Sequence, residues 1–350
     1  MGTDSLVWLQ HLRSETHMRR TTNITDVEGI LVGHYTLRKR PTGCTVITAR
    51  RPFVAGVDVR GGAPGTRETE LLRPENSVDK VHAIFLSGGS AFGLDTAAGI
   101  SRYLEEQGRG FDAQVARIPI VCGAILFDLA LGDPEIRPNA RAGYEAARSA
   151  TRGRISEGNV GAGAGATVGK MTGCEHAMRG GLGSWAFRRP DGLKVGALAV
   201  VNSVGNVLDP KTGTIIAGAR RSDEDGFVDL AAEIQGGFQP SSPFHGNTVL
   251  GVVATNASLT KAQCTKIAQM AHDGLARCIY PSHMPWDGDT VFALSTGAWD
   301  PPKEVADGII GALAADAMAA AIIRGVLKAK SWGQYPSAKD FSKSLSRNVK

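Results

Sequence analysis

The sequence predicts a layered α/β or α+β domain in which sheets and helices pack against one another. Short β-branched runs recur along the 350 residues, helical patterns alternate with them, and no repeat or flexible linker divides the chain. Hydrophobic residues make up 42% and charged residues 21%, a balance typical of globular chains that excludes wholesale disorder. The length suits one large domain or two medium ones with a sizeable core.

Six segments are predicted as strands. Each is short, rich in β-branched residues and bounded by Gly, Pro or Asn. They are Cys44–Ala49, Phe53–Val59, His82–Ser87, Lys194–Val201, Thr248–Thr255 and Thr290–Ser295.

Four segments carry the apolar spacing that predicts helices. The third opens with a capping box formed by Thr260 and Gln263, and the fourth follows a Pro-Pro pair. The first follows a Gly-Gly turn, where Ser90 is predicted as the N-cap. The four helices are Ala91–Gln107, Ala140–Ala150, Thr260–Cys278 and Lys303–Lys330.

The net charge of +5 resides between Lys328 and Lys350, where six basic residues accompany one acid. The rest of the chain is neutral and has no basic face interleaved with aromatic residues, which argues against a nucleic-acid partner. Residues 331–350 are therefore predicted as a solvated basic tail. No uncharged apolar run reaches the roughly 18 residues of a membrane span, so no membrane partner is expected.

Residues 1–22 are predicted as an N-terminal extension outside the fold. They contain no apolar signal-peptide core, and Met18 precedes two arginines. The five cysteines are scattered, odd in number and contain no Cys-x-x-Cys pair. This usage predicts the reduced thiols of a cytoplasmic protein.

Three partial motif matches point to cofactor or nucleophile sites but fail in context. Gly161–Ala166 lacks the preceding strand and the following acid of a dinucleotide site. Ala164–Lys170 resembles a phosphate-binding loop, but Met171 stands where Ser or Thr must hold Mg²⁺. Gly88–Gly93 has Phe92 where a nucleophile elbow requires Gly. The histidines show no zinc spacing, so the sequence predicts neither cofactor nor metal.

A group of polar residues stands next to three predicted strands. Asn247 and Thr248 enter one strand, Asp287 and Asp289 precede another, and Asn202 follows a third. Each pattern has a simpler interpretation, because Thr favours strands and Asp-Gly-Asp favours turns. Taken separately, none of the three patterns establishes a site, but taken together they match the motifs of a known family.

These segments, together with Gly56–Glu68 and Leu86–Leu94, resemble the L-aminopeptidase/D-esterase family, which includes β-aminopeptidases and hydrolases of nylon oligomers. The resemblance runs from about Ile24 to about Val326, with several motifs in the family's order. It implies an α+β fold, a four-layer αββα sandwich of the N-terminal-nucleophile type, over residues 23–330 as a single domain. It also implies a homo-oligomer, with a tetramer favoured.

The resemblance assigns roles to individual residues. Members of the family cut themselves before a Ser or Thr that becomes the nucleophile, which here places the cut between Asn247 and Thr248 and leaves chains 1–247 and 248–350. The likeness places Asn202 on the oxyanion-stabilising Asn, and Asp287 and Asp289 on the acidic pair beside the nucleophile. Lys170 is similar to the active-site Lys of the nylon-oligomer branch.

The sequence departs from the aminopeptidase branch at Phe127, where that branch has a catalytic Tyr. The Asp-Gly-Asp is also closer to the nylon-oligomer branch. A Phe ring in the substrate pocket offers an apolar wall for methylene chains. The predicted substrates are therefore short peptides, amino-acid amides and ω-amino-acid oligomers with a free amine near the scissile amide.

Two other functions remain open at this point. The first is a non-enzymatic α/β module whose Gly-rich loops bind an anion. The second is a relative of the arginine-biosynthesis acetyltransferase, which also cuts itself before a Thr but has a different motif order. A denaturing gel separates a binding module, which stays as one 36.8 kDa band, from a self-processing hydrolase.

Overall fold

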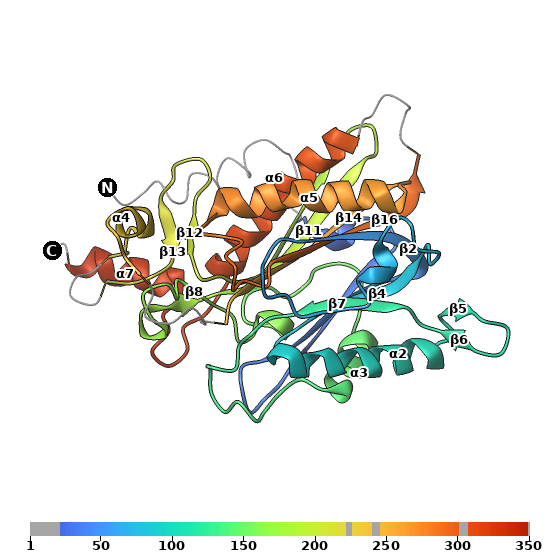
Figure 1. The fold of residues 1–350 in the computed structure, drawn as a ribbon, viewed down its shortest axis with the longest axis horizontal. Helices are drawn as coiled ribbons and strands as arrows, with labels where there is room; N and C mark the ends of the chain where they lie inside the picture. The colour runs from blue at the N-terminus through green and yellow to red at the C-terminus, as the bar shows by residue number, and fades with distance from the viewer. Residues whose placement is uncertain (1–21, 222–225, 240–245, 301–306, 349–350) are drawn as a thin grey trace.

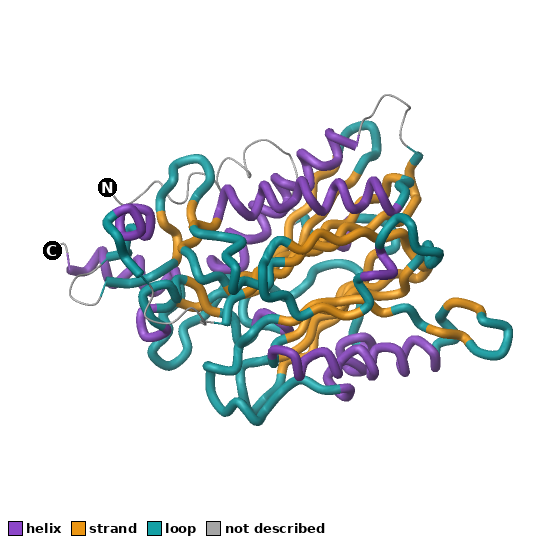
Figure 2. The backbone as a smooth tube through the Cα atoms, in the orientation of Figure 1, coloured by secondary structure: helices purple, strands orange, loops and turns teal. Residues whose placement is uncertain are grey.

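The computed structural model describes residues 22–221, 226–239, 246–300 and 307–348, and these residues form four layers. Helices α5 (Lys261–Cys278) and α6 (Asp307–Leu327) cover one outer face, and α2 (Thr96–Glu106) and α3 (Ala140–Arg148) cover the other. Two layers of strands lie between the helix pairs (Figure 1; Figure 2). The predicted αββα sandwich is confirmed.

The layer beneath α5 and α6, the first sheet, has the order β10-β11-β14-β16-β2. β14 and β16 run parallel, whereas the other neighbours are antiparallel. The strands are β10 (Gly181–Arg188), β11 (Lys194–Asn202), β14 (Thr248–Ala257), β16 (Thr290–Trp299) and the second half of β2 (Gly43–Val59).

The layer above α2 and α3, the second sheet, contains the first half of β2 and four other strands. These are β1 (Ile30–Thr36), β3 (Thr66–Arg67), β4 (Val81–Ser87) and β7 (Val121–Ile125). Because β2 belongs to both layers, the described strands of the two layers form one nine-stranded network.

The two predicted strands Cys44–Ala49 and Phe53–Val59 are a single 17-residue strand, β2. The exposed residues Arg50–Pro52 separate them in sequence, and the register against β4 shifts there between Thr48 and Phe53. Proline cannot donate to a ladder, but it is tolerated at such an irregularity. The sequence break therefore marks a bend in one strand.

Side chains of β14 alternate between two cores. Val249 and Val253 pack in the core between the first sheet and α5 and α6. Leu250 and Val252 pack in the core between the two sheets. Since all ten residues of β14 are buried, this strand and its first residue occupy the centre of the molecule.

Several predicted element ends are corrected. The first helix begins as a 3₁₀ turn, Ser90–Asp95, before α2, and Ser90 is not a side-chain N-cap; its φ is +55°. Asn139 caps α3, and the capping box of Thr260 and Gln263 at α5 is confirmed. The predicted start of the fourth helix at Lys303 lies outside the described residues.

The sequence patterns missed β1, β7 and β10. In β10 the glycines resemble turn residues, but a Cβ at Gly183 would lie 2.2 Å from the carbonyl oxygen of Ala321 in α6. Glycine there permits close helix-sheet packing, which local patterns do not reveal. The remaining short elements are β5 (Phe111–Asp112), β6 (Arg117–Ile118), β8 (Thr167–Val168), β9 (Met178–Arg179), β12 (Asn206–Leu208), β13 (Ile215–Ala217), β15 (Ile279–Tyr280) and α4 (Leu230–Gln235).

Helix α6 is long and apolar enough to cross a membrane by length and composition alone. In the fold, 72% of its most apolar stretch is buried inside the protein. It packs against α5, β10 and β11. Such burial is typical of the core helix of a layered domain.

The C-terminal segment is not simply a solvated tail. Ser337 and Ala338 are buried at the start of α7 (Ala338–Asn348), and the Phe341 and Phe227 rings have centroids 5.0 Å apart. Aromatic and small residues among the lysines dock this segment onto the domain, and the charge pattern concealed them. Residues 349–350 lie outside the described part.

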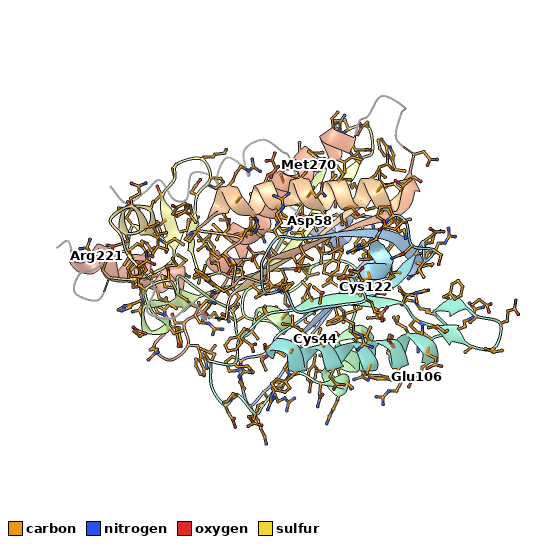
Figure 3. All side chains as sticks on the ribbon, viewed as in Figure 1. Cys44, Asp58, Glu106, Cys122, Arg221 and Met270 are labelled. Atoms are coloured by element: carbon orange, nitrogen blue, oxygen red, sulfur yellow. The ribbon has the colours of Figure 1, made fainter. Side chains whose placement is uncertain are left out.

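All five cysteines have free thiols, and Cys174 alone is partly accessible. Cys44 and Cys122 lie on β2 and β7 (Figure 3). Burial raises the pKa of the Cys44 thiol to about 12, so this thiol stays protonated. The buried cysteines behave as small apolar core residues.

Candidate active site

The predicted site residues meet where three strand ends converge. Thr248 is the first residue of β14 and lies directly opposite Asn202, the last residue of β11. Asp289 immediately precedes β16, which runs parallel to β14 on its other side. All the predicted polar site residues are buried: Lys170, Asn202, Asn247, Thr248, Asp287 and Asp289.

The carbonyl oxygen of Asn247 has two donors. Thr248 Oγ1 donates a hydrogen bond to it, and the Gly288 N–H donates at 3.3 Å. Asn247 also forms an isolated parallel bridge with Asp287. The hydroxyl of Thr248 therefore lies beside the amide bond that joins residues 247 and 248.

Gly288 leaves room for this hydroxyl. A Cβ at residue 288 would lie 2.5 Å from Thr248 Oγ1, which is closer than real Cβ atoms approach. The middle residue of Asp-Gly-Asp is thus glycine because the neighbouring strand brings a hydroxyl against its backbone.

The segment Arg60–Ala63 holds the Asp-Gly-Asp turn. The backbone N–H groups of Arg60 and Gly61 donate to the Asp289 carbonyl at 3.0 and 3.2 Å, and that of Ala63 donates to the Asp287 carbonyl at 2.7 Å. A Cβ at Gly61 would lie 2.3 Å from the Asp287 carbonyl oxygen. Arg60–Ala63, which directly follows β2, therefore fixes the backbone of the turn that carries both acids.

The two acids have different partners. Asp289 accepts the Val249 N–H at 2.7 Å through Oδ1, and the His283 N–H (3.1 Å) and Nδ1 (2.9 Å) through Oδ2. Asp287 accepts the Met284 N–H at 2.9 Å through Oδ2. Its buried Oδ1 has no hydrogen-bond partner among the described residues. Burial and the charge of Asp289 raise the pKa of Asp287.

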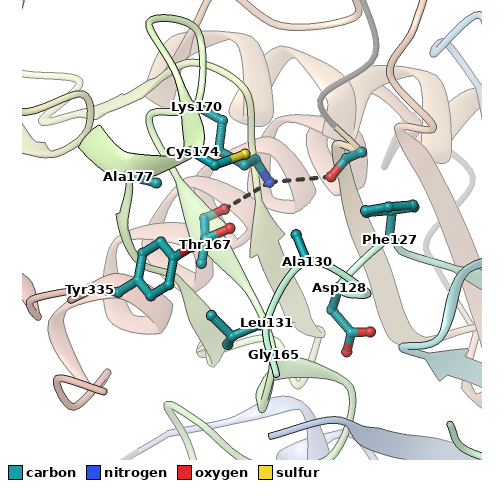
Figure 4. Close-up of a pocket in the computed structure, with 11 residues that line it drawn as sticks. Phe127, Asp128, Ala130, Leu131, Gly165, Thr167, Lys170, Cys174, Ala177 and Tyr335 are labelled. Atoms are coloured by element: carbon teal, nitrogen blue, oxygen red, sulfur yellow. Dashed lines mark hydrogen bonds between the residues drawn. The ribbon is translucent and has the colours of Figure 1, made fainter. Parts of the chain in front are cut away.

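Lys170 contacts the end of β11 and the residue before Asn247. Its Nζ donates to Asn202 Oδ1 at 2.9 Å and to the Asn202 carbonyl oxygen at 3.0 Å. It also donates to the carbonyl oxygens of Thr167 and Gly246 at 3.2 and 3.3 Å (Figure 4). Complete burial lowers the pKa of Lys170 to about 7, against the opposing charges of nearby acidic groups. The ammonium thus ties Asn202 to the residue before Asn247.

The Asn202 side chain makes no hydrogen bond to the Asn247 carbonyl oxygen. Its Nδ2 donates to the carbonyl oxygens of Phe127 at 3.0 Å and Gly246 at 3.3 Å, while Oδ1 accepts the Thr167 N–H at 3.0 Å. In the uncut chain, the predicted oxyanion donor is therefore directed one residue upstream of the expected cut.

Phe127 forms one wall of the small pocket in Figure 4, which also contains Lys170, Cys174 and Tyr335. A Cβ at Gly246 would lie 2.0 Å from the Phe127 ring, so this ring presses against the backbone before the expected cut. The next residue, Asp128, forms a buried ion pair with Arg40 at 2.8 Å and fixes the loop.

Replacing Lys170 with Met is expected to change how stability depends on pH. Between the folded pKa of about 7 and the usual 10.5, the unfolded chain binds one proton more than the folded chain. Raising the pH through this window therefore stabilises the unsubstituted protein, by roughly a few kcal/mol. Thermal unfolding at pH 7 to 10 should show this rise in the unsubstituted protein only; parallel curves would contradict it.

The sequence reading did not identify His283, which contacts Asp289. It stands six residues before that acid, and a lone histidine in a loop carries no recognisable spacing. Among the described residues, no group of three or more His, Cys, Asp or Glu side chains is placed to hold a metal ion.

Comparison with known proteins decides the family. The model of "Peptidase family S58" matches residues 22–337.

The chain belongs to peptidase family S58.

Its S58 relatives include an uncharacterized aminopeptidase of Mycobacterium tuberculosis, 43% identical, over 91% of this chain and 97% of the relative. A 6-aminohexanoate-oligomer endohydrolase of Paenarthrobacter ureafaciens is 31% identical, over 79% and 76%. The family and these relatives establish the S58 chain as a hydrolase. The resemblance to the L-aminopeptidase/D-esterase family is confirmed.

Solved structures support the S58 fold. The L-aminopeptidase D-Ala-esterase/amidase of Ochrobactrum anthropi aligns with a TM-score of 0.69 at 18% identity, covering 95% of this chain and 96% of that one. A β-aminopeptidase of Burkholderia aligns with a TM-score of 0.67 at 22% identity, covering 94% of each chain. The former is described as a variant of the Ntn hydrolase fold.

Proposed function

We propose that this S58 hydrolase cuts itself between Asn247 and Thr248 and then uses Thr248 as an N-terminal nucleophile on amide bonds. One observation carries the proposal: Thr248 Oγ1 and the Gly288 N–H both donate to the carbonyl oxygen of Asn247. A nucleophile and an oxyanion donor thus face one amide bond before any substrate arrives.

The cut proceeds as an N→O acyl shift. Thr248 Oγ1 attacks the Asn247 carbonyl carbon, its proton passes to the Thr248 nitrogen, and the C–N bond breaks. The resulting ester joins Asn247 to Thr248 Oγ1. Water hydrolyses that ester, releasing a carboxylate on Asn247 and restoring the hydroxyl of Thr248. The Gly288 N–H stabilises the oxyanion during both steps.

Cleavage creates the general base. In the uncut chain the Thr248 nitrogen is an amide and cannot accept a proton, whereas a free α-amine has a pKa of about 7.7–8.0. That amine can take the hydroxyl proton during attack on a substrate. The unpartnered Oδ1 of Asp287 is an acceptor suited to hold the ammonium that forms.

Departure of residues 246 and 247 also frees donors. Lys170 Nζ and Asn202 Nδ2 both donate to the Gly246 carbonyl in the uncut chain. Once that carbonyl leaves, both groups can donate to a substrate. Asn202 then supplies the oxyanion contact that the resemblance implies, a role worth roughly 3–4 kcal/mol in comparable sites.

Intact-mass analysis of the purified protein tests the proposal. The expected result is two chains, the second beginning at Thr248. A single 36.8 kDa chain under all conditions would overturn self-processing and leave a hydrolase that acts without this cut. Membership of family S58 favours a hydrolase over the acetyltransferase alternative.

The proposed substrates are short peptides, amino-acid amides and ω-amino-acid oligomers. The Phe127 ring supplies an apolar wall beside Gly246, the position that the acyl part of a substrate would take after cleavage. One relative is a 6-aminohexanoate-oligomer endohydrolase, and its substrate contains such methylene chains.

Acetylating the amine of a substrate is expected to slow hydrolysis about tenfold or more. The two buried acids Asp287 and Asp289 attract a substrate ammonium near the scissile amide, and an acetamide cannot replace that charge. The measurement compares kcat/KM for one oligomer with its amine free and the same oligomer acetylated. Equal rates would show that the two acids orient only Thr248 and do not bind the substrate amine. Lys170 and Asn202 would then bind a carbonyl of the substrate on the amino-terminal side of the scissile amide.

A further inference from the structure

His283 contacts one acid of the site through two donors. It lies in the loop between β15 and Asp289, and its backbone has a φ of +57°. Both its N–H, at 3.1 Å, and its ring Nδ1, at 2.9 Å, lie within hydrogen-bond distance of Asp289 Oδ2. A carboxylate accepts, so the ring nitrogen carries the proton and donates.

The other oxygen of Asp289 reaches the strand of the proposed nucleophile. Asp289 Oδ1 accepts the Val249 N–H at 2.7 Å. Since Val249 follows Thr248 in β14, the carboxylate joins the His283 loop to the beginning of that strand. Its orientation therefore affects where the Thr248 hydroxyl and nitrogen lie.

His272 of α5 supports the ring of His283. The two ring centroids are 4.8 Å apart at 73°, an edge-to-face contact. His272 Nε2 lies 3.1 Å from the carbonyl oxygen of Asp58, which Figure 3 labels beside α5. Burial lowers the pKa of His272 to about 4, so this ring is neutral and donates from Nε2.

A turn alone does not require this histidine. Asn and Gly adopt positive φ more readily, and the backbone N–H of residue 283 would contact Asp289 with either. The ring adds a second, charge-assisted donor, and its buried Nε2 has no hydrogen-bond partner among the described residues. The contact with Asp289 is the polar interaction that the ring makes there.

We propose that His283 is a positioning residue that donates from Nδ1 to Asp289 and so fixes the carboxylate that orients the start of β14. The inference rests on the proposed function, since it concerns the same nucleophile. His283 acts through Asp289, since both of its hydrogen bonds go to that carboxylate and not to Asn247 or Thr248.

Three variants distinguish the hydrogen-bond donor of His283 from the volume of its ring and from its backbone conformation. His283→Asn keeps a donor at the position of Nδ1 and tolerates positive φ. His283→Leu keeps bulk but has no donor, and His283→Gly has no donor but relieves the backbone. His82→Asn is the control, because His82 is a buried histidine in β4 whose Nδ1 accepts the Ile120 N–H.

The measurements are the rate of appearance of the chain beginning at Thr248, and kcat and KM for an aminoacyl p-nitroanilide. We expect His283→Leu and His283→Gly to lower kcat and the cutting rate about ten- to a hundredfold, with KM within about twofold. His283→Asn should stay within about threefold of the unsubstituted protein, and His82→Asn should match it.

Two results would overturn the inference alone while the unsubstituted protein is cut and active. One is unchanged rates in His283→Leu and His283→Gly; the other is a loss in His283→Asn as large as in His283→Leu, which would assign the effect to ring packing or charge. An unsubstituted protein without a Thr248 terminus would instead overturn the proposed function, and this inference with it.

Discussion

A Thr248→Ala variant should remain a single chain and lose amide hydrolysis. The substitution removes Oγ1, the proposed nucleophile that lies against the Asn247 carbonyl, and leaves the rest of β14 unchanged. Removal of a nucleophile typically costs on the order of 10⁴-fold or more in kcat. Intact mass and hydrolysis of an aminoacyl p-nitroanilide measure the two effects.

Two matched substitutions test whether cutting depends on the hydroxyl at residue 248 or on the stability of β14. Thr255→Ala makes the same change on β14 and removes a hydroxyl that donates to the Lys194 carbonyl at 2.9 Å. That variant should be cut normally, with a stability loss of about 1 kcal/mol. Thr248→Ser keeps a hydroxyl and should still be cut. A Thr248→Ala protein cut after Asn247 would contradict the mechanism.

Gly288→Ala is expected to slow cutting by roughly a hundredfold. The added methyl group would lie 2.5 Å from Thr248 Oγ1, so either the hydroxyl or the Asp-Gly-Asp turn must move. Misplacement of a reacting group by about 1 Å commonly has an effect of this size. The rate at which the chain beginning at Thr248 appears provides the measurement.

Gly308→Ala is the control for this substitution. A Cβ at Gly308, in the first turn of α6, would meet no atom of the described residues within 4 Å. Alanine in a helix is favoured over glycine by about 1 kcal/mol, so this variant should be cut normally and unfold no earlier. Normal cutting of Gly288→Ala would show that the turn yields without disturbing Thr248.

Local patterns predicted the cores of most large elements, because β-branched runs and helical spacing report burial directly. They missed β10, whose glycines serve close packing with α6, and they divided β2 at Pro52. The prediction that residues 331–350 form a solvated tail was wrong. Charged residues dominate the composition of that segment and conceal Phe341, whose ring packs against the domain.

The site could be predicted only through the family resemblance. Asn202, Thr248 and Asp289 are far apart in sequence, and the pairing of β11, β14 and β16 that joins them is non-local. No periodicity specifies which strands become neighbours. The contact between His283 and Asp289 depends on loop geometry, so neither pattern nor resemblance revealed it.

The position of β14 between β11 and β16 also bears on what a cut molecule is. Residues 1–247 supply β11 and β2, whereas residues 248–350 supply β14 and β16, so the two pieces interleave in one sheet. After cleavage, the β11–β14 and β16–β2 ladders would still join the two chains. The product would be a heterodimer in which neither chain contains a whole sheet. Reassembly after denaturation would then be second order in protein, whereas the precursor folds as one chain. Native folding would precede processing, and a cut molecule, once unfolded, would recover poorly at low concentration.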